Sequence, residues 1–275
     1  MLYGVFFGQL YFAKSKGELK TLAEGFERIV PKGISYVDID SSLFDKIDIE
    51  EYLALLKGYN LKTQSLFSLF DFNFDDKSAL ASFKEDAKRQ LEMCAKIGTS
   101  MFMPVPVVSK VNSPNERTDA RNALIDYLGY TVEKSQEYGV TTMIENYSNN
   151  SCPFSYIDDI KYILAQVPDL KYALDTGNFY FCDDDAFDAY SLFREKTVHV
   201  HLKDIAPSSG GALTINGKCC NSLPIGDGDV KIKETLLALQ KDGYTGGLTI
   251  EINDENDSVP KIEKSVDYIK SILEN

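Results

Sequence analysis

The chain has 275 residues, 44 % of them hydrophobic, which is enough for one large domain with a sizeable core. It carries 42 acidic and 29 basic residues, a net charge of −13, so its acidic surface should repel polyanions and we expect no nucleic-acid partner. The longest apolar stretches are strand-sized and residues 1–11 lack a basic region, so we expect no membrane span, no signal peptide and a cytoplasmic location. The five cysteines lack metal-finger spacing and are expected to be free thiols.

Short apolar runs alternate with longer amphipathic segments along the chain, and eight of these runs have the length and composition of strands. In chain order they are Leu2–Phe7, Ser35–Ile39, Thr63–Phe67, Met101–Val105, Thr142–Glu145, Tyr172–Asp175, Val198–Leu202 and Leu248–Ile252.

The segments between these runs have the periodicity of helices, with apolar residues at spacings of three and four. Two examples are Leu19, Leu22, Phe26 and Ile29 near the start, and Ile262, Val266, Ile269 and Leu273 near the end. Gly33, Gly98 and Gly139 each stand shortly before a predicted strand, where glycine allows the left-handed conformation that ends a helix.

The regular alternation of strand and helix predicts a parallel sheet in an α/β protein. Eight such units in a chain of this length favour a closed (β/α)₈ TIM barrel over an open sheet, as a single domain spanning residues 1–275. The first strand is not followed by GxGxxG, and no GxxxxGK[ST] occurs, which counts against the nucleotide-binding open sheets.

Four of the later strand candidates have a residue type that binds metals at their last or last but one position: Glu145, Asp175, His201 and Glu251. A carboxylate at the end of a buried strand is costly unless it is paired, and three converging carboxylates repel one another. A divalent cation relieves both problems, and carboxylates with one neutral imidazole suit Mn²⁺, Mg²⁺, Co²⁺, Fe²⁺ or Zn²⁺. The spacings correspond to one or two βα units, which places the four side chains at the barrel face where such enzymes keep their active sites.

Each residue also has a plainer interpretation. A strand-end glutamate is often a solvated residue, Asp175 is suited to capping the turn after it, and His201 could bond a carbonyl. The metal site is favoured because four ligand types recur at equivalent places. His199 shares the side-chain parity of His201 one layer deeper, so a supporting role is expected for it.

Several segments together resemble a known family. They are Ile144-Glu145-Asn146, Leu174-Asp175-Thr176-Gly177-Asn178, His199-Val200-His201-Leu202-Lys203-Asp204 and Pro224-Ile225-Gly226-Asp227-Gly228. The chain resembles the xylose isomerase-like TIM barrel superfamily, in its sugar phosphate isomerase/epimerase branch of ketose 3-epimerases and inositol-catabolism enzymes. The resemblance runs over the whole chain and is strongest from Thr141 to Asn253. It is specific to the superfamily and not to one activity within it.

The resemblance implies that Glu145, Asp175, His201 and Glu251 bind one divalent metal ion, and that Glu145 and Glu251 act as acid and base. The chain departs from the ketose epimerases where they carry His, Glu and Arg, at Asn178, Ser151 and Pro207 respectively. The metal ligands are therefore kept while the contacts to substrate differ. The apurinic-endonuclease branch uses a histidine-rich three-metal cluster, which two histidines in the chain do not supply.

We therefore expect metal-dependent isomerisation or epimerisation of a sugar or polyol, by removal of a proton next to a metal-bound carbonyl. Lys203 is a candidate for binding a substrate oxygen, with a salt bridge to Asp204 as the alternative. Asn178 is a candidate for a substrate hydroxyl, with capping as the alternative. Phe7 and Phe67 are candidates for packing against a sugar.

Two rival functions remain at this stage. One is a dehydratase of the inosose dehydratase type, and the other is a catalytically silent sugar-binding barrel. The oligomeric state is open, and a homo-oligomer is compatible with the sequence.

Overall fold

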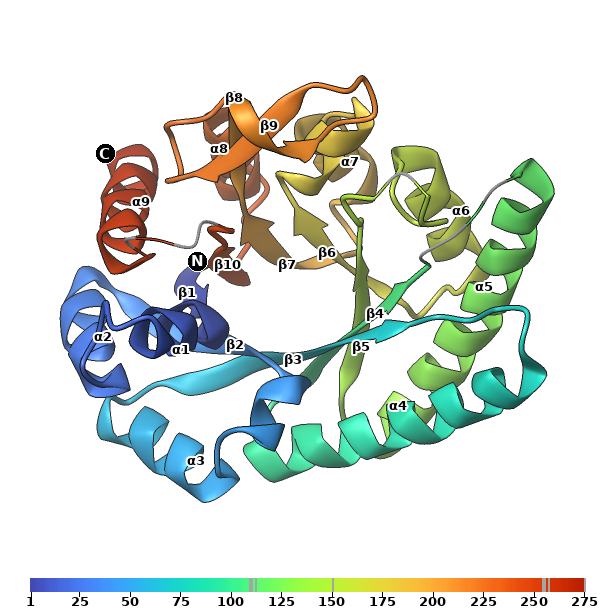
Figure 1. Cartoon of the computed structure of the whole chain (residues 1–275), viewed down its shortest axis with the longest axis horizontal. Helices are drawn as coiled ribbons and strands as arrows, with labels where there is room; N and C mark the ends of the chain where they lie inside the picture. The colour runs from blue at the N-terminus through green and yellow to red at the C-terminus, as the bar shows by residue number, and fades with distance from the viewer. Residues whose placement is uncertain (109–110, 112, 150, 254–255, 257, 275) are drawn as a thin grey trace.

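The computed structural model describes residues 1–108, 111, 113–149, 151–253, 256 and 258–274. Within them, eight parallel strands close into a barrel in the order β1-β10-β7-β6-β5-β4-β3-β2, which confirms the predicted TIM barrel (Figure 1). The barrel strands are β1 (Leu2–Phe6), β2 (Ile34–Asp40), β3 (Lys62–Asp71), β4 (Met101–Val107), β5 (Thr141–Glu145), β6 (Lys171–Asp175), β7 (Thr197–Leu202) and β10 (Gly247–Ile250).

The helices lie around the outside of the barrel (Figure 1). They are α1 (Phe7–Ser15), α2 (Leu22–Ile29), α3 (Ile49–Gly58), α4 (Lys77–Ile97), α5 (Pro114–Glu137), α6 (Ile157–Gln166), α7 (Ala186–Phe193), α8 (Ile232–Lys241) and α9 (Ser258–Leu273), with 3₁₀ turns η1 (Val30–Lys32), η2 (Ser41–Asp45) and η3 (Asn178–Cys182). Among the described residues, no helix combines the length and the apolar character needed to cross a membrane.

Local chemistry explains where several helices begin and end. Thr21 accepts a hydrogen bond from the backbone N–H of Glu24 at the start of α2, and Asp48 caps α3 in the same way. Gly33, Gly98 and Gly139 have φ angles of 109°, 74° and 65°, so the predicted left-handed residues after helices are confirmed. The five cysteines are free, also as predicted.

The apolar faces of strands and helices form one main core between the barrel wall and the surrounding helices. In the C-terminal helix α9, the predicted apolar positions Ile262, Val266 and Ile269 are fully buried. A smaller apolar cluster, with Met103 and Met143 among its members, lies inside the barrel itself. The barrel interior is therefore filled by side chains, and this apolar cluster takes up the part of it next to β4, β5 and β6.

Most strand limits differ from the prediction by a few residues, and two of these differences concern the pocket and the candidate ligands. Phe7 belongs to α1 and not to the first strand, because α1 follows β1 without a loop. Glu251 and Ile252 lie just beyond β10, although the N–H of Glu251 still donates to the carbonyl of Leu202 on β7 at 2.9 Å. Glu251 therefore keeps the position of a strand-end residue.

A two-stranded antiparallel hairpin, β8 (Asp204–Leu213) and β9 (Cys219–Leu223), is inserted between β7 and α8 and was not predicted. It lies above the barrel at the top of Figure 1. The backbone N–H of Ile215 at its tip donates to the carbonyl of Phe181 in η3 at 2.8 Å. The hairpin thus connects the end of β7 to the turn that follows β6.

Candidate metal centre and active site

Three of the predicted ligands meet at the carboxyl ends of neighbouring strands. Asp175 on β6 pairs in register with His201 on β7, and Glu145 ends β5 on the other side of β6. Asp175 and His201 are fully buried, whereas Glu145 is 9 % exposed. One ligand atom from each of these three side chains lies within 4.8 Å of the other two.

His201 stands at the centre of the cluster. Its Nδ1 lies 2.8 Å from Oε2 of Glu145 and 3.9 Å from Oε2 of Glu251, which enters from β10. The structure therefore brings the four predicted ligands into one cluster, in which Glu145, Asp175 and His201 are the compact part and Glu251 lies at the edge.

Asp175 and Glu251 each use one carboxylate oxygen to bond neighbouring N–H groups, and the other oxygen of each points into the cluster. Oδ1 of Asp175 accepts the backbone N–H groups of Gly177 and Asn178 at 2.8 and 2.7 Å. Oε1 of Glu251 accepts from Nζ of Lys203 at 2.5 Å and from the amide of Asn253 at 3.0 Å. The capping role considered for Asp175 is thus present, and it occupies only one of the two oxygens.

Lys203 is buried beside this cluster and neutralises part of its charge. Its Nζ lies 3.5 Å from Oδ2 of Asp175 and 3.0 Å from Oδ1 of Asn178, besides its contact with Glu251. The alternative salt bridge with Asp204 is wrong. The Asp204 carboxylate instead accepts backbone N–H groups from the loop after β9.

Asn178, a candidate for a substrate hydroxyl, is largely occupied within the protein. Its amide nitrogen donates to the carbonyl of Asn146 at 2.8 Å, and its oxygen accepts from Lys203. Asn146 in turn accepts at its side-chain oxygen from the hydroxyl of Tyr172 at 2.7 Å. Asn178 lines the pocket, and these bonds make it a support for Lys203.

The electrostatic environment shifts the pKa values of the cluster. Burial raises the pKa of Asp175 to about 7, with Glu251 and Glu145 acting in the same direction and Lys203 against it. Burial would lower the pKa of His201, but its hydrogen bond to Glu145 and the surrounding carboxylates raise it to about 9. Burial would raise the pKa of Glu251, but Lys203 and His201 bring it below its usual value.

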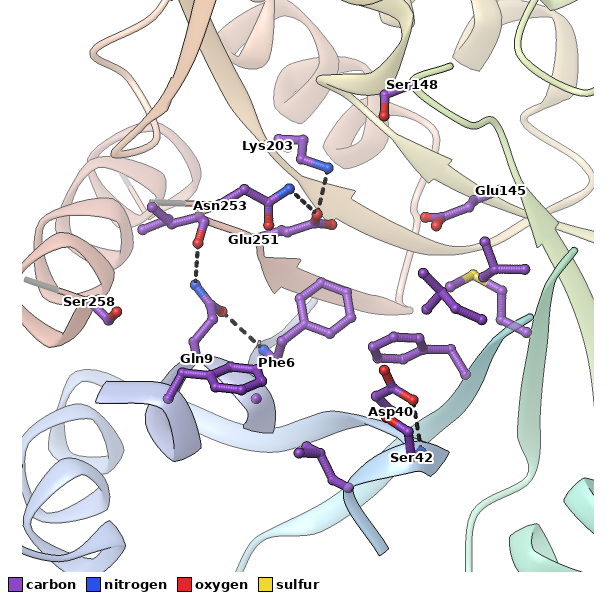
Figure 2. A pocket seen from close by; sticks show the side chains of 18 of the residues that line it. Phe6, Gln9, Asp40, Ser42, Glu145, Ser148, Lys203, Glu251, Asn253 and Ser258 are labelled. Atoms are coloured by element: carbon purple, nitrogen blue, oxygen red, sulfur yellow. Dashed lines mark hydrogen bonds and ion pairs between the residues drawn. The ribbon is translucent and has the colours of Figure 1, made fainter. Parts of the chain in front are cut away.

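A cavity of about 660 Å³ opens onto the cluster. Figure 2 shows the carboxylates of Glu145 and Glu251 reaching toward a common space from opposite sides, with Lys203 beside Glu251. Much of the remaining lining is apolar, with Phe6, Phe12, Leu43, Phe67, Leu69, Met103 and Val105. Polar side chains such as Gln9, Lys16, Asp40, Ser42 and Lys46 stand among them. The pocket therefore combines an extensive apolar surface with a few polar groups, which is the usual composition of a small-molecule site.

Phe67 lines the pocket, where its predicted contact with a sugar is possible and stays a prediction, whereas the prediction for Phe7 is wrong. Phe7 is buried in the core on α1, and Phe6 takes its place in the pocket wall. The ring of Phe6 packs edge-on against Phe67 and against His201, at centroid distances of 5.1 and 4.8 Å. Strand parity explains the error, because adjacent residues of a strand face opposite sides.

A second polar group lies one layer deeper in the barrel, and the sequence analysis found only one of its members. His199 is fully buried and its Nε2 lies 2.8 Å from Oδ2 of Asp38 on β2. Burial raises the pKa of Asp38, but the charges and hydrogen bonds of His199 and its neighbours more than offset this and lower it. The sequence did contain a signal for Asp38. It lies in the run Val37-Asp38-Ile39-Asp40, and a carboxylate inside a predicted strand indicates that the side chain has a polar partner.

The donor set fits a divalent cation. Three carboxylates converge on a buried imidazole, and Lys203 is the lysine that the structure places against two of them, Asp175 and Glu251. Carboxylate oxygens with one imidazole nitrogen suit the hard and borderline divalent ions, and the ion would relieve the remaining repulsion. Glu145, Asp175 and His201 form the compact part of this set, and the free oxygen of Glu251 completes it.

Comparison with solved structures gives several barrels of the same fold. The IolI protein with a bound zinc atom aligns with a TM-score of 0.78 at 16 % identity, covering 99 % of this chain and 98 % of that one. The probable 3-DHS dehydratase AsbF from Bacillus anthracis aligns with a TM-score of 0.75 at 14 % identity, covering 98 % of this chain and 99 % of that one. The D-allulose 3-epimerase from Methylomonas sp., in complex with D-allulose, aligns at 0.73 and 18 %, covering 99 % and 97 %.

At these identities the solved structures establish the fold alone, and no curated protein matches the sequence. The family model described as xylose isomerase-like TIM barrel, however, matches residues 21–272, which is most of the chain. This confirms the resemblance drawn from the motifs at the ends of the later strands. The chain belongs to the xylose isomerase-like TIM barrel family.

Proposed function

We propose that this chain is a divalent-metal-dependent isomerase or epimerase of a sugar or polyol. The observation that carries the proposal is the convergence of Glu145, Asp175, His201 and Glu251 on one space at the carboxyl end of the barrel, open to a pocket of about 660 Å³. The likeness in fold to the zinc-containing IolI protein and to a D-allulose 3-epimerase supports it.

The four side chains would hold the ion, which would polarise a substrate carbonyl and acidify the adjacent C–H bond. The substrate would lie in the pocket between the carboxylates and the apolar lining. Phe6 and Phe67 would contact its carbon face, because the C–H groups of a sugar pack well against aromatic rings. The volume suits a compound of monosaccharide size with room to spare.

Glu145 and Glu251 are the acid and base of this proposal. They approach the same space from β5 and β10, so one can remove a proton from one face of a substrate carbon and the other can return one to the opposite face (Figure 2). Lys203 and His201 hold Glu251 ionised, which is the state in which a carboxylate accepts a proton. Its bonds to Lys203 and Asn253 also fix the direction of its second oxygen.

Lys203 has two roles in this arrangement. It orients Glu251, and its positive charge on the pocket wall would attract a substrate oxygen. Asn178 holds the ammonium group in place through its side-chain oxygen. We propose a small-molecule sugar or polyol as the partner, and no nucleic acid, because the pocket has the volume of a small-molecule site and the whole chain carries a charge of −13.

The test is a panel of ketoses and inososes turned over in deuterated water with Mn²⁺ present. Carboxyl protons exchange with solvent much faster than a typical turnover of roughly 10 per second, so the product should carry deuterium at one carbon next to the carbonyl. Glu145→Gln and Glu251→Gln keep the side-chain shape and should each lower turnover by at least ~100-fold.

Other products would identify other functions. A product lighter by one water would indicate the dehydratase. An isomerised product without deuterium would refute the two-glutamate mechanism. No turnover of any compound that binds would favour the silent sugar-binding barrel.

A further inference from the structure

Asp38 is the centre of a fully buried hydrogen-bond group directly beneath the metal centre. Its Oδ1 accepts from the hydroxyl of Ser65 on β3 at 2.7 Å. Its Oδ2 accepts from the hydroxyl of Thr249 on β10 at 2.5 Å and bonds Nε2 of His199 on β7 at 2.8 Å. Residues of four strands thus converge on one carboxylate inside the barrel.

The proton positions in this group follow from its geometry. The Tyr36 hydroxyl lies 2.9 Å from the Thr249 oxygen, and Thr249 can then direct its own proton to Asp38. An ionised carboxylate accepts only, so His199 must carry its proton on Nε2 to bond it. Asp38 therefore receives three donors, which hold its carboxylate in one orientation and leave it poorly suited to bind a second metal ion.

His201 is the ring next to this carboxylate on the side of the metal centre. Its Nδ1 lies 2.8 Å from Oε2 of Glu145, so in the metal-free chain this nitrogen carries a proton that it donates to the carboxylate, and a bound ion would take the place of that proton. Its Nε2 is buried and has no hydrogen-bond partner among the residues that the structure describes. Among the described residues, the carboxylate oxygen nearest to Nε2 is Oδ2 of Asp38, at 3.8 Å. At that distance a carboxylate attracts an N–H group without forming a full hydrogen bond.

A histidine that binds a metal through one ring nitrogen carries its proton on the other, and the group facing that proton fixes which nitrogen is free. We propose that Asp38 is a positioning residue that keeps the His201 proton on Nε2 and so presents Nδ1 to the cluster of Glu145, Asp175 and Glu251. The inference rests on the proposed metal-dependent function. It adds that the affinity for the ion depends on a residue that does not touch it.

The first test uses the fact that the chain has only two histidines. A long-range ¹⁵N–¹H spectrum of the Zn²⁺-loaded full chain, labelled at the imidazole nitrogens, should show two ring systems. The expected pattern is one ring with metal on Nδ1 and a proton on Nε2, assigned to His201, and one metal-free ring with its proton on Nε2. A metal-bound ring with its proton on Nδ1 would overturn the proposal.

The second test measures Zn²⁺ affinity by competition with a chromophoric chelator. Asp38→Asn removes the negative charge at nearly the same size and should weaken binding by ~10–100-fold, the usual effect of losing a residue that supports a metal-binding histidine. Ser65→Ala is the matched control, because it removes a donor from the other oxygen of Asp38 and leaves Oδ2 facing His201. Its affinity should change by less than ~3-fold.

The outcomes separate the two proposals. A folded Asp38→Asn protein with unchanged Zn²⁺ affinity would refute the positioning role while leaving the metal centre intact. A wild-type chain that binds no Zn²⁺ would refute the metal-dependent function and the positioning role with it. If Asp38→Asn does not fold, a metal-bound ring with its proton on Nδ1 in the wild-type spectrum would still refute the positioning role.

Discussion

His201 and Asp175 are the two groups of the metal centre that change protonation near neutral pH. The pKa of His201 is raised to about 9 and that of Asp175 to about 7, both above their ordinary values. A raised pKa means that the folded chain binds the proton more tightly than the unfolded chain does. The free energy of unfolding that each such group contributes is therefore complete below its ordinary pKa and is lost as pH rises through its raised pKa. The metal-free chain should therefore lose stability as pH increases from about 4 to about 9.

Metal binding should have the opposite dependence on pH. The ion binds the deprotonated groups, so uptake should release close to two protons below about pH 7 and close to one between about pH 7 and about pH 9. Thermal unfolding with and without saturating Mn²⁺, from about pH 6 to about pH 8.5, measures both effects. The stabilisation by Mn²⁺ should grow with pH in the wild-type chain. A stabilisation that is constant over this range would remove His201 and Asp175 from the ligand set.

Individual residues differ in how far the sequence reveals them. Glu145, Asp175 and His201 were found because each stands at or next to the end of a buried strand, where a polar side chain needs a partner. Asp38 obeys the same rule but was missed because it stands in the middle of its strand, where nothing in the sequence shows which residues face it. Phe6 was missed because α1 begins directly after β1, so the sequence does not show which of Phe6 and Phe7 faces the inside of the barrel.

The loop after β9 and the start of β8 form a unit that supports the active site from outside the barrel. Asp204 follows Lys203 directly and accepts the backbone N–H groups of Gly226, Gly228 and Val230 at 2.8, 2.9 and 3.2 Å. A Cβ atom on Gly228 would meet Oδ1 of Asp204 at 2.2 Å, which explains why glycine stands there. The backbone N–H groups of the Gly226-Asp227-Gly228 segment thus hold Asp204, the residue next to Lys203, in place.

Gly228→Ala should therefore lower the free energy of unfolding by ~1–3 kcal/mol, the usual cost of an extra methyl group in a packed position. Gly210→Ala, on the neighbouring strand β8, is the control, because a Cβ there meets no atom within 4 Å. It should change stability by less than ~0.5 kcal/mol. Urea unfolding of both variants measures the difference. Equal stability of the two variants would contradict the prediction, because it would mean that the loop around Asp204 accommodates the extra methyl group.

Elements were predicted well where periodicity is strong. All eight barrel strands were found, with ends displaced by a few residues, because their apolar runs are separated by helical spacing. The β8–β9 hairpin was missed because its strands carry small and polar residues such as Gly210 and Ser222, with no alternating apolar pattern. The one signal available was Asn216-Gly217, a typical hairpin-turn pair.

The barrel as a whole determines which residues can cooperate. Closure brings β10 between β1 and β7, so Glu251 reaches the ligands of β5, β6 and β7 although it lies 50 residues beyond His201. The order of the strands was predictable from the alternation of strand and helix. The partner of each carboxylate was not, because it depends on side-chain direction in the closed barrel, as Lys203 with Glu251 shows.

The metal content of the whole chain tests the proposed centre most directly. After equilibration with Zn²⁺ or Mn²⁺ and removal of free ion by gel filtration, elemental analysis should find about one equivalent per wild-type chain. The described residues offer two groups that could hold an ion, and in the group of Asp38, His199 and His201 the carboxylate is already held by three donors, which leaves the group of Glu145, Asp175 and His201. The double variant Asp175→Asn, His201→Asn should remain folded and retain less than ~0.1 equivalent. Two or three equivalents in the wild-type chain, or an undiminished content in the double variant, would contradict a single metal centre at these residues.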